Sequence, residues 1–180
     1  MAIVTNIVGD LLLSDTDFIV HQINSVVVKP HGLSAAIAAK WPWACRYAQR
    51  RQDGSRNLAI EEDHDAPGSV VLMQPPIGVK APIVVGLVGQ YEMGRPLAYN
   101  RGLPLSSQDT KINREEWFLQ GLNKLAVIMR ATKKYSAAFP KYIGSALAGG
   151  CWASYNRMIS EDFARLVPEA EIRIIELPKC

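Results

Sequence analysis

Short apolar runs alternate along the chain with longer stretches in which apolar residues recur every three or four positions. The short runs are rich in Val and Ile and have the length of buried strands, roughly four to eight residues; they lie at 3–8, 18–23, 69–73, 83–88, 136–139 and 171–177. The longer stretches predict helices at 33–40, 42–52, 113–133 and 152–166. The order β, β, α, α, β, β, α, β, α, β predicts an α/β fold, in which a mixed sheet is covered by helices on both faces.

The most regular helical pattern lies at 113–133. Asn113 and Glu116 have the spacing of a capping pair, so we expect this helix to begin near Asn113. The segment before it, 89–112, has no sustained periodicity and is rich in Gly, Pro and Ser, which predicts a long loop. Long loops in compact domains often cover or line a binding site.

Length and composition limit the class of protein. A chain of 180 residues is long enough for one buried core and short for two, so we expect a single domain spanning 1–180. No apolar run approaches the roughly 20 residues of a membrane span, and the first residues lack a basic leader and a cleavage site, so neither membrane insertion nor secretion is expected. The odd number and wide spacing of Cys45, Cys151 and Cys180 argue against a disulfide framework. This usage fits a reducing compartment, which predicts a cytoplasmic location and leaves the nucleus open.

The charge of the chain gives little support to a nucleic-acid partner. The formal net charge is only +3. Four arginines gather in one region, and a solvated helix face explains them better than a nucleic-acid patch; they are Arg46, Arg50, Arg51 and Arg56. No His or Cys spacing resembles a metal site, so the sequence predicts neither a metal nor another cofactor.

Candidate chemistry begins where the second predicted strand ends. His21 and Asn24 interrupt an apolar run near its carboxyl end, and a turn containing Gly32 leads into a helix whose first turn includes Ser34. In α/β proteins the crevice at the carboxyl ends of the strands holds ligands, and a helix amino terminus favours negative charge. A phosphorylated ligand fits this arrangement best. The alternative is a structural strand in which His21 and Asn24 only satisfy nearby backbone groups.

A second loop of small residues covers 144–150, between the fifth predicted strand and the last predicted helix. Small side chains let the backbone approach a diphosphate closely and donate its amide hydrogens. Asp10 follows the first strand, where a carboxylate either caps a turn or accepts a hydrogen bond from an exocyclic amine. We expect the strand ends at Asp10, Asn24, Gln90 and Gly144 to converge on one crevice.

Several of these motifs together resemble the macrodomain family. They are GD after the first strand, IVHQINS at the second, GLSAAIAAKWP after it, VGQY after a central strand, and FPKYIGSALAGGCW before the last helix. The similarity covers nearly the whole chain and is closest to the branch that includes ADP-ribose 1''-phosphate phosphatases. It implies a three-layer α/β/α fold with a central mixed sheet of about six strands. It also implies ADP-ribose, ADP-ribose 1''-phosphate or an ADP-ribosylated protein as the partner.

The resemblance also implies roles for individual residues. Asp10 matches the aspartate that binds the adenine amino group, with the amide of Leu11 beside it. Asn24 matches the asparagine that contacts the distal ribose, and His21 matches a histidine proposed for catalysis. The remaining matches form the two loops around the distal ribose and the diphosphate, together with the strand exit between them; they are Gly32, Leu33, Ser34, Gln90, Gly144, Ser145, Ala146, Leu147, Ala148, Gly149, Gly150 and Cys151.

Three functions follow as hypotheses. In the first, the chain is a phosphatase or ester hydrolase acting on ADP-ribose derivatives. Loop amides then hold the 1''-phosphate, His21 acts as general acid or base, and Asn24 fixes the ribose while water attacks phosphorus. In the second, the chain is a non-catalytic module that binds ADP-ribose; the presence of His21 favours activity, whereas Cys151 at a position that is commonly acidic favours binding alone. The third is a nucleic-acid-binding domain that uses the arginine cluster.

Overall fold

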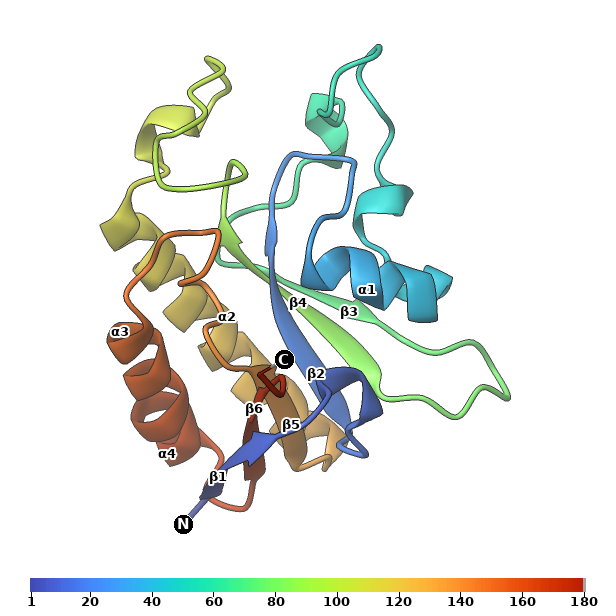
Figure 1. Ribbon diagram of the computed structural model, residues 1–180, viewed down its shortest axis with the longest axis vertical. Helices are drawn as coiled ribbons and strands as arrows, with labels where there is room; N and C mark the ends of the chain where they lie inside the picture. The colour runs from blue at the N-terminus through green and yellow to red at the C-terminus, as the bar shows by residue number, and fades with distance from the viewer. Residues whose placement is uncertain (180) are drawn as a thin grey trace.

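The computed structural model describes residues 1–179 and contains a six-stranded sheet with the order β1-β6-β5-β2-β4-β3 (Figure 1). Neighbouring strands are parallel except for β3 and β4, so the sheet is mixed. Each predicted strand is present within two residues of its predicted bounds; the observed strands are β1 (Ile3–Val8), β2 (Phe18–Asn24), β3 (Val70–Met73), β4 (Ile83–Gln90), β5 (Ser136–Pro140) and β6 (Glu171–Glu176).

Helices cover both faces of this sheet. Along β2, Phe18 and Val20 belong to the large core beneath α2 (Lys111–Thr132) and the helical segment 152–166, whereas Ile19 packs with the side that carries α1 (Leu33–Lys40). This alternation follows from the two-residue period of a strand, which turns successive side chains to opposite faces. The sequence prediction of an α/β fold with a mixed sheet of about six strands is therefore confirmed.

The last helical segment is continuous but not uniform. It consists of α3 (Trp152–Arg157), a π-helical stretch (Met158–Phe163) and α4 (Ala164–Leu166). Tyr155, Ile159 and Phe163 point into the core below the sheet. The predicted helix at 152–166 is thus present, with a wider turn in its middle that keeps these side chains on the core side.

Two helix predictions need correction. The segment 42–52 forms two 3-10 turns, Pro42–Ala44 and Tyr47–Gln49, because Cys45 between them has an extended backbone (φ −90°, ψ 95°). The long helix α2 begins at Lys111, and its cap is Thr110, whose side chain accepts a hydrogen bond from the Asn113 amide at 3.2 Å. Asn113 therefore lies inside the first turn, since the helix starts earlier than the apolar pattern indicates.

Two further sequence expectations concern membranes and cysteines. Among residues 1–179, no helix combines the length and the apolar character needed to cross a bilayer. Cys45 is buried, Cys151 is exposed, and neither forms a disulfide within the described part of the chain. Cys180 lies outside the described residues.

Candidate ligand-binding site

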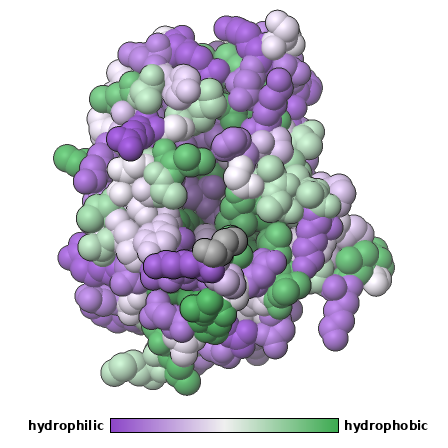
Figure 2. Space-filling model, viewed as in Figure 1, coloured by the Kyte–Doolittle hydropathy of each residue, from purple (hydrophilic) through white to green (hydrophobic). Residues whose placement is uncertain are grey.

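A cavity of about 740 Å³ opens at the carboxyl ends of β2, β4 and β5. Figure 2 shows this hollow between α1 and the loop that follows β5. Its walls come from the end of β2, from the segment 27–34, from the start of the loop 91–110 and from the segment 140–148. Parallel strands of one sheet end on the same edge, so residues separated by more than 100 positions meet here.

The structure brings most of the predicted site residues to this cavity. Those lining it are His21, Asn24, Gly32, Leu33, Ser34, Gln90, Gly144, Ala146, Leu147 and Ala148. The other predicted residues do not line the cavity; they are Asp10, Leu11, Ser145, Gly149, Gly150 and Cys151.

The first loop presents backbone amides at the start of α1. Gly32 is the helix cap and adopts a left-handed φ of 55°, a conformation that costs glycine little. Within residues 1–179, the amides of His31, Gly32 and Leu33 have no hydrogen-bond acceptor, and all three residues line the cavity. Amides arranged in this way at a helix amino terminus bind anions.

The second loop folds tightly over an aromatic ring. A side chain at Gly144 or Gly150 would place its Cβ 2.2 or 2.6 Å from atoms of the Tyr155 ring, so both positions require glycine. Ala146 is not among the residues with positive φ, which are Tyr142, Gly144 and Gly149 in this region, so its Cβ fits without backbone strain.

This second loop also presents amides. Its internal hydrogen bonds use the amides of Ser145, Ala146, Gly149 and Gly150. Those of Gly144, Leu147 and Ala148 have no acceptor within the described residues, and these are the loop positions that line the cavity together with Ala146. The two loops thus offer free N–H groups from two sides of one cavity.

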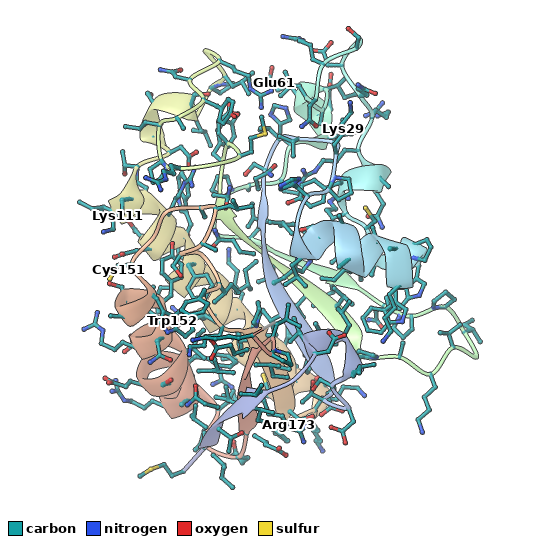
Figure 3. The ribbon with its side chains drawn as sticks, in the orientation of Figure 1. Lys29, Glu61, Lys111, Cys151, Trp152 and Arg173 are labelled. Carbon is teal, nitrogen blue, oxygen red and sulfur yellow. The ribbon has the colours of Figure 1, made fainter. Side chains whose placement is uncertain are left out.

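The charge of the cavity wall also suits an anion. Lys29, His31 and Lys141 line it, and none of its described lining residues is Asp or Glu. Figure 3 shows Lys29 on the loop that follows β2. Lys141 pairs with Glu176 at 2.7 Å, and this hydrogen bond raises the pKa of the Lys141 ammonium, which keeps it charged.

His21 lies at the bottom of the cavity and is buried. Its Nδ1 is 3.3 Å from the Ser34 hydroxyl, and its Nε2 has no partner among the described residues. Burial lowers the pKa of His21 to about 4, because the charged imidazolium loses its hydration. The ring is therefore neutral at pH 7: one ring nitrogen can accept a proton, and the imidazolium form that would act as a general acid is not populated.

No protein-family model matches the sequence, and neither does any curated protein. Solved structures do match over nearly the whole chain. The macrodomain of Mycobacterium tuberculosis DarG superposes with a TM-score of 0.70 at 17% identity, covering 99% of this chain and 100% of that one. The chain has the macrodomain fold.

Two further structures with the macrodomain fold give the same result. The macrodomain of Thermus aquaticus DarG has a TM-score of 0.65 at 14% identity, with 99% of this chain and 100% of that chain covered. A mutant of the Oceanobacillus iheyensis macrodomain with ADPR has a TM-score of 0.59 at 15% identity, with 97% and 84% covered. At these identities the likeness establishes the fold and does not transfer an activity.

In this macrodomain fold most hydrogen-bonding groups of the Asn24 side chain stabilise the turn that follows it. Its side-chain oxygen accepts hydrogen bonds from the amides of Val26 and Val27 at 3.2 and 3.0 Å, and its Nδ2 donates to the Tyr47 hydroxyl at 3.4 Å. Arg50, fully buried, donates to the carbonyls of Asn24 and Val27, each at 2.6 Å. One N–H of the Asn24 amide remains for a ligand in the cavity.

The remaining predicted residues have local roles as well. Asp10 caps the short turn Leu11–Leu13 by accepting the Leu12 amide at 2.9 Å, which leaves its second oxygen exposed to solvent. Gln90 donates to the Glu92 carbonyl and accepts from Gln22, each at 2.8 Å.

Cys151 lies exposed at the start of α3, on the left edge of the molecule in Figure 3. Hydrogen bonds from the backbone and hydroxyl of Ser154 lower the pKa of its thiol. A thiolate at a helix start is more reactive than an ordinary cysteine.

The arginine cluster does not form a free basic patch on this macrodomain fold. Arg46 and Arg50 both pair with Asp65, at 2.6 and 2.8 Å. Arg51 pairs with Asp63 at 2.8 Å and Arg56 pairs with Asp53. A carboxylate faces each guanidinium, so these residues support the local structure. The described residues also contain no cluster of three His, Cys, Asp or Glu side chains suited to a metal ion.

Sequence reasoning missed several residues that line the cavity. Lys29 and His31 lie in the turn before α1, and Tyr47 lies in the segment 42–52, which was predicted to be a helix. Tyr99 comes from the long loop, and Lys141 and Tyr142 come from the segment after β5. The one available signal was their position next to the glycine-containing turns.

Proposed function

We propose that the chain binds ADP-ribose and derivatives that carry a further group on the distal ribose. The observation that carries this proposal is the pair of loops whose free amides lie on two sides of a cavity without lining carboxylates. A diphosphate carries negative charge on both phosphates and accepts several hydrogen bonds, so it complements such a cavity. The Oceanobacillus iheyensis macrodomain with ADPR, which shares the fold, adds support by analogy.

In the proposed orientation the adenine lies at the Asp10 end and the distal ribose at Asn24. Asp10 follows β1, whose neighbour β6 ends at Glu176, and Glu176 pairs with Lys141 on the cavity wall. The second carboxylate oxygen of Asp10 is available to accept a hydrogen bond from an exocyclic amine. At the other end, Lys29 and His31 line the cavity; the Lys29 ammonium would pair with a 1''-phosphate, and a ring N–H of His31 would donate a hydrogen bond to it.

Calorimetry with ADP-ribose tests the binding proposal. We expect saturable heat with one ligand per chain. Ala148→Glu introduces a carboxylate into the cavity and should weaken binding at least tenfold, because it repels the diphosphate. Ala98→Glu adds the same charge at an exposed position outside the cavity and serves as the matched control. Absence of saturable heat with the unmodified chain would disprove the proposal.

A second candidate is hydrolysis of ADP-ribose 1''-phosphate or of an ADP-ribosyl ester, as in the phosphatase-like branch. The pair formed by His21 and Ser34 beside Asn24 favours it, since a neutral imidazole can accept a proton from water or from a hydroxyl. The proton would pass to Nδ1 through the Ser34 hydroxyl, with which Nδ1 is in contact. Asn24 would orient the distal ribose.

Release of phosphate from ADP-ribose 1''-phosphate, and of ADP-ribose from an ester-linked protein, tests the second candidate. His21→Gln removes the titrating group and should lower turnover by roughly 10²- to 10⁴-fold. Unchanged turnover in this variant would exclude His21 as the base. If the unmodified chain binds ADP-ribose and turns over neither compound, the non-catalytic binding module is the correct assignment.

A further inference from the structure

A buried arginine behind the cavity connects two adjacent segments of its wall. Arg114, in the first turn of α2, is 2% exposed, and all five of its N–H donors have acceptors. Its Nε and Nη2 donate hydrogen bonds to the two carboxylate oxygens of Asp109, at 2.7 and 2.6 Å. Nη2 also donates to the Glu92 carbonyl at 3.3 Å. Its Nη1 donates to the carbonyls of Gly94 and Ala148 at 2.6 and 3.2 Å.

Gly94 and Ala148 belong to different segments of the cavity wall. Gly94 lies in the loop 91–110, and Ala148 lies in the loop that presents free amides; both residues line the cavity. Arg114 is not a lining residue and reaches the two carbonyls from behind the wall. The Arg114 side chain therefore hydrogen bonds both segments and fixes the direction of these two carbonyls.

Asp109 holds Arg114 in place from the other side. Its two oxygens also accept the amides of Tyr91 and Glu92, at 3.1 and 2.9 Å, where β4 ends. Asp109 is fully buried, so the pair is shielded from water and from salt. The start of α2, the end of β4 and both loops are thereby tied to one rigid ion pair.

The direction of the two carbonyls matters for an anionic ligand. Because the oxygens of Gly94 and Ala148 point to Arg114, they point out of the cavity. If either peptide rotated, its partly negative oxygen would face the ligand's phosphates and repel them. We propose that Arg114 is a positioning residue that keeps the diphosphate part of the cavity open and free of carbonyl oxygens. This inference rests on the proposed binding of ADP-ribose.

Lysine cannot replace arginine in this role. A lysine would keep the positive charge and could pair with Asp109, but it has three donors on a single atom, not a planar fork. It cannot hold Asp109 with two parallel bonds and reach both carbonyls as well. Arg114→Lys therefore separates the effect of geometry from the effect of charge.

The test compares Arg114→Lys with Arg101→Lys. Arg101 is the matched control because it also pairs with a buried carboxylate, Glu92, and donates to a carbonyl, that of Asn57. None of its hydrogen bonds or ion pairs reaches the loop 144–150. We expect Arg114→Lys to weaken ADP-ribose binding at least tenfold and Arg101→Lys to weaken it less than threefold. Thermal unfolding of both variants records their loss of stability.

The affinity for adenosine separates a loss of the diphosphate site from general destabilisation, because destabilisation would weaken the binding of adenosine and ADP-ribose alike. It lacks the diphosphate, so Arg114→Lys should leave its affinity within twofold of the unmodified chain, as measured by ligand-observed NMR. ADP-ribose binding within threefold of normal, or an equal loss for both ligands, would overturn the inference while leaving the proposed function intact. Failure of the unmodified chain to bind ADP-ribose would overturn the proposed function itself.

If Arg114→Lys does not fold, Asp109→Asn loosens the same pair at equal volume and is expected to give the same selective loss.

Discussion

Individual polar residues at the cavity bond within the protein through some of their atoms and leave other atoms free to bind a ligand. His21 contacts Ser34 while its ring stays neutral, and Asn24 uses its side-chain oxygen to fold the turn that follows it. A buried polar group left without a partner costs about 1–3 kcal/mol, which explains why these side chains are bonded within the protein. Two atoms of cavity-lining side chains are exceptions: the Nε2 of His21 and the Oε1 of Gln22 have no partner in the described residues.

The low pKa of His21 predicts a pH-dependent stability. Its pKa is about 4 in the folded chain and near 6.5 when unfolded, so the unfolded state binds more protons between these values. Stability from this group is complete above pH 6.5 and is lost as the pH falls towards 4. Between pH 7 and pH 5 the loss should be about 2 kcal/mol.

Urea unfolding of the unmodified chain and of His21→Gln at pH 7 and pH 5 measures this loss. The variant controls for all other titrating groups, since it lacks only the imidazole. An equal change with pH in both proteins would mean that His21 titrates normally in the folded state.

The helices around the site are positioned mainly by the residues at which they begin. Helix α1 begins at a glycine with positive φ, and α2 begins at Thr110, whose hydroxyl caps the first turn. The start of α2 is especially important because Asp109 and Arg114 lie on either side of the cap and hold the cavity wall. Losing the cap would therefore affect both helix stability and the site.

Thr110→Ala tests where α2 begins. It removes the hydroxyl that accepts the Asn113 amide and should lower the free energy of unfolding by about 1 kcal/mol. The matched control is Asn113→Ala, which leaves the cap in place and removes only the exposed hydrogen bond from the Asn113 Nδ2 to the Gln108 carbonyl at 2.6 Å. Chemical denaturation measures both. A larger loss of unfolding free energy for Asn113→Ala than for Thr110→Ala would mean that Asn113 is the helix cap, as the sequence pattern predicts.

At the scale of the whole molecule, the parallel arrangement of five strands gathers every wall of the cavity on one edge of the sheet. The opposite end of the sheet carries the loop 74–82 between β3 and β4, which projects to the lower right in Figure 1, and none of its residues lines the cavity. A ligand in the cavity thus contacts segments that are distant in sequence, and its binding energy stabilises them together.

Hydrogen exchange with and without ADP-ribose tests this convergence. We expect slower exchange at 31–33 and at 144–148, and unchanged exchange at 74–82, which serves as the internal control. At a ligand concentration 100 times Kd, global unfolding should cost about 2.7 kcal/mol more. Protection confined to one of the two loops would contradict a ligand that spans both.

Prediction from the sequence succeeded where local pattern decides structure. Strand periodicity located all six strands, since a buried strand needs only a short apolar run. It failed at 42–52, where Tyr47 and Arg50 are buried to support the Asn24 turn and not to form a helix face. It also could not show that the arginines of this region each face an aspartate, because Asp63 and Asp65 approach them only after folding.

The amino-acid sequence by itself determined the strands, most of the helices and the two glycine-containing loops, because these depend on neighbours within a few residues. Only the tertiary structure decided which amides remain free, that His21 is neutral and that Arg114 joins Gly94 to Ala148. Those properties depend on burial and on contacts between segments far apart in the chain, which no local pattern records.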